Sequence, residues 1–156
     1  MTKNCFEEKK ETVNVEALLA KYGTIQMAPK GYSMYPVIVP ERDQVILKQA
    51  DAMPLKRGMV VLYRRADDTL VLHRVYKVKQ DGIYLVGDNQ VEIEGPIQKS
   101  QIKAVLVGLV RKGKRVSVLN LFYVVLTRIW LCFLPLRPQM KKIAYRLKHA
   151  KDKNNA

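Results

Sequence analysis

The sequence has few of the residues that build disulfide frameworks and metal sites. Only two cysteines are present, Cys5 and Cys132, and they lie near opposite ends of the 156-residue chain. A single distant pair does not form a disulfide framework, and neither cysteine has the spacing of a metal ligand. We therefore expect free thiols in a reducing compartment and no metal site.

A long apolar run is missing from the first residues. Residues 1–11 carry charges of both signs, whereas a secretory signal peptide needs an apolar stretch of about 7–15 residues. This excludes a signal peptide or a membrane anchor in that segment. We expect the N-terminal region to stay in the cytosol.

Acidic residues are also scarce. The chain has 14 Asp and Glu against 28 Lys and Arg, which gives a net charge of +14 and suggests an anionic partner. The basic residues gather around an apolar stretch at residues 116–136, and residues 1–22 are too few for a pair of DNA-recognition helices. We therefore expect an anionic membrane surface as the partner and no nucleic acid.

Short runs rich in Val, Ile, Leu and Tyr fill the middle of the chain, with turn residues between them. They predict strands at residues 24–27, 44–48, 59–64, 70–79, 83–86 and 102–110. Before them, Asn14 caps a predicted short helix at Val15–Tyr22, which Gly23 ends. The pattern predicts a mainly β protein in three parts: an N-terminal segment with a short helix (1–23), a coiled antiparallel β-domain (24–112), and an apolar helix with a basic tail (113–156).

The apolar stretch at residues 116–136 is nominally long enough to cross a bilayer, which takes about 20 residues. Arg128 lies near its middle, where a charge is costly. At helical spacing, Ser117, Asn120, Thr127 and Arg128 form a polar stripe opposite Leu119, Phe122, Leu126, Ile129, Trp130 and Phe133. This pattern favours an amphipathic helix lying in the membrane interface, with a membrane-spanning helix or a core or dimer helix as alternatives.

Two residues in the β-domain are candidates for nucleophilic catalysis. Ser33 follows a glycine turn at Gly31, and Pro36 keeps the preceding residue extended, so the hydroxyl can stand clear of the backbone. His73 lies between Val71 and Val75 on one face of its strand, which favours the neutral imidazole that a general base needs. Taken singly, each fits a turn serine or a half-buried structural histidine equally well.

A third motif is the turn Gly87-Asp88-Asn89. Turn chemistry alone explains it, but its carboxylate could also orient a histidine from a neighbouring strand.

Taken in order, Ser33 with Met34 and Pro36, then His73 with Arg74, then Gly87-Asp88-Asn89 resemble the signal peptidase I superfamily, which includes the LexA-type repressors. The resemblance covers roughly residues 25–108. Bacterial members have a lysine at the position of His73. In this respect the chain resembles the Ser–His branch, found in the endoplasmic-reticulum and archaeal signal peptidases.

This resemblance implies a membrane-associated serine endopeptidase that uses no cofactor. It implies Ser33 as nucleophile, His73 as general base and Asp88 as the acid, with Glu94 as the alternative acid. Its substrate would be a leader, signal-like or regulatory peptide with small residues near the cut, bound as an extended strand near Met34 and Val39. The β-domain would lie on the cytoplasmic side.

Two other functions remain open. A catalytically weak or inactive protein on the same fold could bind a peptide as an added strand. A LexA-like DNA-binding regulator is the weaker alternative, because the N-terminal segment is too short for its recognition helices.

Overall fold

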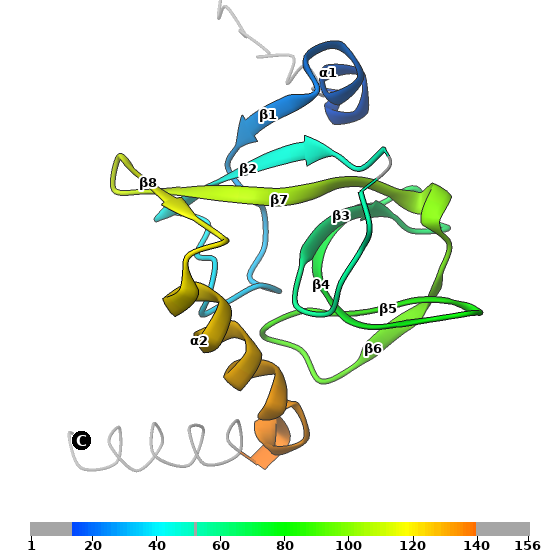
Figure 1. The fold of residues 1–156 in the computed structure, drawn as a ribbon, viewed down its shortest axis with the longest axis vertical. Coiled ribbons are helices and arrows are strands. Elements are labelled where there is room, and N and C mark those ends of the chain that lie inside the picture. The colour runs from blue at the N-terminus through cyan, green and yellow to red at the C-terminus, as the bar shows by residue number, and fades with distance from the viewer. Residues whose placement is uncertain (1–13, 52, 140–156) are drawn as a thin grey trace, which may run out of the picture.

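The computed structural model describes residues 14–51 and 53–139, and its fold is mainly β (Figure 1). All pairings in its eight-stranded sheet are antiparallel, as the sequence predicted. The strands are β1 (Thr24–Met27), β2 (Asp43–Gln49), β3 (Val60–Arg64), β4 (Leu70–Lys79), β5 (Gly82–Val86), β6 (Ile93–Ile97), β7 (Ile102–Arg111) and β8 (Lys114–Ser117). The helices are α1 (Val15–Tyr22) and α2 (Leu121–Cys132), with short 3-10 turns η1 (Lys99–Gln101) and η2 (Leu134–Leu136).

The short N-terminal helix is confirmed with the expected ends. The side chain of Asn14 accepts a hydrogen bond from the backbone N–H of Ala17 at 3.1 Å, and Gly23 ends the helix in the left-handed conformation. Leu19 is buried, so one apolar side chain fixes the helix to the sheet.

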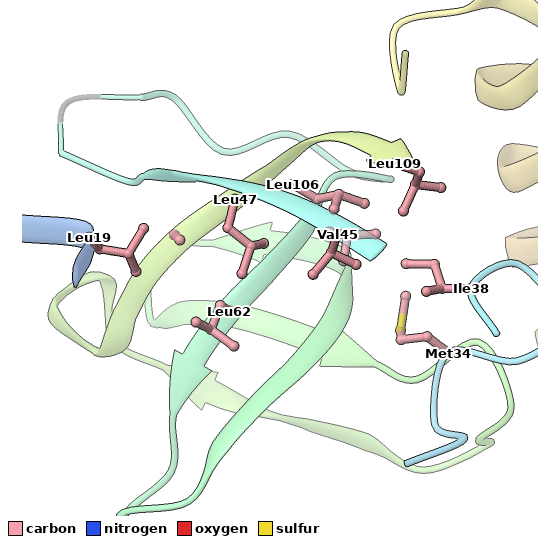
Figure 2. Close-up of a cluster of buried hydrophobic side chains, with 10 residues drawn as sticks. Leu19, Met34, Ile38, Val45, Leu47, Leu62, Leu106 and Leu109 are labelled. Atoms are coloured by element: carbon pink, nitrogen blue, oxygen red, sulfur yellow. The ribbon is translucent and has the colours of Figure 1, made fainter. Parts of the chain in front are cut away.

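The sheet runs in the order β1-β2-β7-β3-β4-β5-β6, and β8 pairs with β7. Its two faces cover two apolar clusters, because side chains alternate along a strand. In β3, Val60 and Leu62 belong to one cluster, whereas Val61 and Tyr63 belong to the other. Figure 2 shows the first cluster, which also takes in Met34 and Ile38 from the loop before β2.

Two strands were missing from the prediction. β6 contains Gly95 and Pro96, which are turn signals in the sequence, but proline is tolerated at a sheet edge and β6 is the last strand on its side. β8 is short and basic, and it lies against the end of β7 that β3 leaves free. The sheet therefore continues beyond residue 112.

The expectation of one apolar helix across residues 116–136 is wrong. Residues 114–117 form β8, and Asn120 then caps α2 by accepting a hydrogen bond from the N–H of Phe122 at 2.9 Å. α2 ends at Cys132, before a 3-10 turn that contains Pro135. Within residues 14–51 and 53–139, no helix has the length and apolar character needed to cross a bilayer.

The two faces of α2 also differ from the predicted stripes. Thr127, assigned to the polar stripe, is buried against the sheet, and Trp130, assigned to the apolar face, donates a hydrogen bond to the β-domain. Leu119, Phe122, Leu126, Ile129 and Phe133 are exposed, as expected of the other face. The N-terminal residues 1–13 with Cys5, and most of the basic tail (140–156), lie outside the described residues.

Candidate active site

Ser33 lies on a tight turn that two buried side chains hold in place. Gly31 has a left-handed φ of 74°, which starts the turn, and Met34 and Ile38 insert into the first apolar cluster (Figure 2). The N–H of Ile38 donates to the carbonyl of Met34 at 2.9 Å. Ser33 remains half-exposed between these anchors.

His73 lies in the middle of β4, opposite Val61 of β3, and only 1% of it is exposed. Its Nδ1 is 3.3 Å from the hydroxyl of Tyr63 and 3.4 Å from Oε1 of Glu94. Its Nε2 is buried and has no hydrogen-bond partner among the described residues. The tautomer with the proton on Nδ1 satisfies that side of the ring and leaves the Nε2 lone pair available.

Ser33 and His73 line the same cavity, which has a volume of about 220 Å³. The polar lining residues are Lys30, Arg65 and Gln90, and the apolar ones include Met34 and Leu72. The structure therefore brings the sequence-predicted nucleophile and base to one pocket, although they are forty residues apart in the chain. Val39 does not line this cavity, and its N–H donates to the carboxylate of Asp43 at 2.9 Å.

The surroundings of His73 keep it neutral. Burial is the largest influence and lowers the pKa of His73 to about 4, because the charged imidazolium loses its hydration. The negative charge of Glu94 opposes this change, whereas the positive charge of Arg65 adds to it. At neutral pH the ring is therefore unprotonated and able to accept a proton.

Glu94 comes from β6 and is the carboxylate that lies beside His73. It accepts hydrogen bonds from the Tyr63 hydroxyl at 2.5 Å and from Nε of Arg65 at 2.8 Å, and it forms a second contact with the Arg65 guanidinium. Burial alone would raise the pKa of Glu94, but these donors hold it below its ordinary value. An ionised carboxylate thus faces the Nδ1 side of His73.

Asp88 has a different partner. Its two carboxylate oxygens accept hydrogen bonds from Nε and Nη2 of Arg74 at 2.8 and 2.6 Å, and both side chains are fully buried. Arg74 follows His73 in β4, so Asp88 fixes the neighbour of the base. The structure places Glu94 against the imidazole and Asp88 against the adjacent residue.

The Gly87–Gln90 turn (residues 87–90) also touches the nucleophile segment. The N–H of Asn89 donates to the carbonyl of Ser33 at 2.7 Å, and a Cβ at Gly87 would come within 2.8 Å of that carbonyl oxygen. Only glycine allows so close an approach. The sequence motif therefore serves the nucleophile segment as well as closing β5.

Tyr63 and Arg65 are functional candidates that the sequence did not indicate. Both belong to a run of ordinary strand and turn residues, and their contacts with Glu94 depend on β6, which was not predicted. Comparison of the chain with protein-family models, characterised proteins and solved structures gives no match. Its function is therefore inferred from the chemistry of this site.

Proposed function

We propose that the chain is a serine endopeptidase of the signal-peptidase type, with Ser33 as nucleophile and His73 as general base. One observation carries the proposal: a buried, neutral histidine whose Nε2 has no partner among the described residues lines the same cavity as a half-exposed turn serine. Burying a ring nitrogen without a hydrogen bond costs about 1–3 kcal/mol. A substrate-linked proton transfer gives that arrangement a use.

The mechanism is acyl transfer. The Ser33 hydroxyl gives its proton to Nε2 of His73 as its oxygen attacks the scissile carbonyl, and the imidazolium then protonates the leaving amine. Water, deprotonated by the same nitrogen, releases the acyl group and restores the serine. The carboxylate of Glu94 stabilises the transient imidazolium through Nδ1, where Oε1 lies 3.4 Å away. Gly31 offers no hydroxyl, so backbone N–H groups would hold the oxyanion.

The substrate is a peptide bound in extended form with small residues near the cut. A cavity of about 220 Å³ with apolar walls that include Met34 and Leu72 accepts a small side chain better than an aromatic one. We place leaders and signal-like or regulatory peptides in this class.

Labelling with a fluorophosphonate, which reacts preferentially with activated serines, tests the proposal. We expect a mass increase on the peptide that contains Ser33 in the wild-type protein, and none in Ser33→Ala or His73→Ala, because the two residues act as one unit. Ser100→Ala, a serine change outside the cavity, is the matched control and should label like the wild type. Undiminished labelling of His73→Ala would refute the Ser–His mechanism.

The alternative is an inactive peptide-binding protein on the same fold. Labelling combined with a peptide-binding measurement separates the two: a protein that binds peptides in a cavity-dependent way but is never labelled at Ser33 supports the alternative.

We also propose that the protein docks on an anionic membrane surface at the cytoplasmic side. The outer face of α2 exposes Leu121, Phe122, Leu126 and Ile129, and basic residues are exposed in α2 (Arg128) and in the hairpin before it (Lys112, Lys114 and Arg115). An exposed apolar helix face in a chain with exposed basic residues suits the headgroup region of anionic lipids. Such lipids are enriched in the cytoplasmic leaflet.

A further inference from the structure

The Gly87–Gln90 turn connects the nucleophile, the base and the segment after the sheet. On one side, Asn89 bonds to the Ser33 carbonyl. On another, Asp88 holds Arg74, the neighbour of His73. A shift of this turn would therefore move both partners of the proposed Ser–His pair.

The third side of the turn is held by the α2 arm, which we define as residues 118–139. The indole Nε1 of Trp130 donates to the carbonyl of Asp88 at 2.9 Å. Nη1 of Arg137 donates to the carbonyls of Gly87 at 3.0 Å and Gln90 at 2.8 Å. Two side chains thus satisfy three of the four carbonyls in the turn.

These two side chains also fix each other. Nη2 of Arg137 donates to the carbonyl of Trp130 at 3.1 Å, and its guanidinium carbon lies 5.1 Å from the centre of the indole ring. Arg137 is 3% exposed although it carries a charge, and no carboxylate accepts from it in the described part of the chain. Burying a charged guanidinium costs free energy, because the group loses its hydration. The side chain could avoid this cost by facing solvent, yet it is buried against three backbone carbonyls.

We infer that Trp130 and Arg137 are positioning residues of the active site: they hold the Gly87–Gln90 turn, which in turn sets the place of Ser33 relative to His73. The inference rests on the proposed peptidase function. It assigns to the inner face of α2 a role that is separate from the membrane docking of its outer face. Neither residue touches the cavity, so both act through the turn.

The physical basis is the steep dependence of acyl transfer on geometry. A misplacement of about 1 Å can lower the rate about 100-fold, whereas binding of a small reagent in the cavity depends little on that distance. Loss of a turn contact should therefore slow the chemical step and leave the affinity for the reagent unchanged.

The test is the kinetics of fluorophosphonate labelling over a range of reagent concentrations, which separates the maximal rate constant from the half-saturating concentration. Trp130→Phe keeps an aromatic ring and removes the N–H donor, and Arg137→Lys keeps the charge and removes the branched donor set. We expect each to lower the maximal rate about 10- to 100-fold with little change in half-saturation. Val125→Ala, at an exposed position of the same helix, is the matched control and should label at the wild-type rate.

The outcomes separate this inference from the proposed function. If the wild-type protein is not labelled at Ser33, the peptidase proposal itself fails. If the wild type is labelled and both variants reach the maximal rate of the wild type, the positioning role is overturned. Urea unfolding of each variant shows whether it is still folded. If Arg137→Lys is unfolded, the labelling rate of Trp130→Phe, the milder change, decides the outcome. An equal effect of Val125→Ala on the maximal rate would likewise overturn the positioning role.

Discussion

The two candidate acids have different partners: Glu94 lies beside His73, and Asp88 pairs with Arg74. Substitutions should therefore distinguish their roles. Glu94→Gln removes the negative charge that lies 3.4 Å from Nδ1 of His73. Because this charge raises the pKa of His73, its loss makes the imidazole a weaker base and leaves the imidazolium unpaired. We expect labelling of Ser33 to slow by about 10²-fold or more, with a small change in the urea midpoint.

Asp88→Asn should act through stability. It leaves the fully buried Arg74 without a counter-charge, and breaking a buried pair costs about 3–5 kcal/mol. Urea unfolding and the labelling rate, measured on both variants, give opposite rankings for the two residues. If Asp88→Asn unfolds like the wild type and loses labelling, while Glu94→Gln labels normally, the acid is Asp88.

The burial of His73 also makes folding depend on pH. Its pKa is about 4 in the folded protein, below the ordinary value of 6.5, so between these values the unfolded chain binds a proton that the folded protein does not. Stability therefore falls as the pH drops from about 6.5 towards 4, by up to about 1.4 kcal/mol per pH unit.

Urea unfolding at several pH values from 7 to 4.5 measures this slope. The slope should be smaller in His73→Gln and unchanged in His149→Gln, the chain's other histidine. Equal slopes in the wild type and His73→Gln would show that His73 is not buried in its neutral form.

At the scale of single residues, the sequence pointed to Ser33 and His73, which the structure places in one cavity, but it left two candidates for the acid. Their turn and strand settings follow from local patterns, such as the glycine before Ser33 and the valines around His73. The partners of Asp88 and Glu94 depend on which strands lie side by side, which no local pattern contains.

At the scale of the elements, removal of α2 and the turn after it should lower both the stability of the fold and the rate of labelling at Ser33. Truncation after Lys114 deletes most of β8, the whole α2 arm and the buried residues Leu131 and Leu134, which pack with Val86. Each buried leucine contributes about 1.5–3 kcal/mol. We expect the truncated chain to lose at least about 2 kcal/mol of unfolding free energy and to label at Ser33 more slowly.

Truncation after Gln139 keeps every contact among residues 14–51 and 53–139 and is the control, so comparison of the two truncated chains isolates the contribution of residues 115–139 to stability and labelling. A protein truncated after Lys114 that unfolds at the full-length urea midpoint would show that the α2 arm is not part of the folded unit.

The elements also show why prediction succeeded in some places and failed in others. The confirmed strands have several β-branched residues between clear turn signals, and the confirmed helix has a capping residue at each end. The sequence did not predict β6, because Gly95 and Pro96 indicate a turn. The prediction of one long apolar helix was wrong, because hydrophobicity alone cannot locate a break such as Asn120. In both cases the sheet edge or the buried face decided the structure.

For the whole molecule, the asymmetry of charge and exposed apolar surface predicts selective vesicle binding. We expect the protein to float with vesicles that contain about a third phosphatidylserine, to leave them as salt rises, and to ignore vesicles of phosphatidylcholine alone. Leu126→Glu places a charge in the exposed face of α2, where the wild-type side chain is 48% exposed, and should abolish flotation.

Val78→Glu makes the same change at a residue of similar exposure on β4 and should float like the wild type. Equal flotation of the two variants would show that α2 is not the docking element. Resistance of the intact protein to alkaline carbonate extraction would show that it is embedded more deeply than an interfacial helix allows.

The position of Trp130 and Arg137 after all eight strands has a consequence during synthesis. The ribosome delivers Ser33, His73 and the Gly87–Gln90 turn before it delivers the two side chains that hold the turn. We therefore expect that a nascent chain can pair its strands while Ser33 is still loosely placed. On the proposed mechanism, hydrolytic activity would reach its full rate only after residue 137 has left the exit tunnel and folded back, so that an unfinished protease would cut peptides being made nearby more slowly than the complete one.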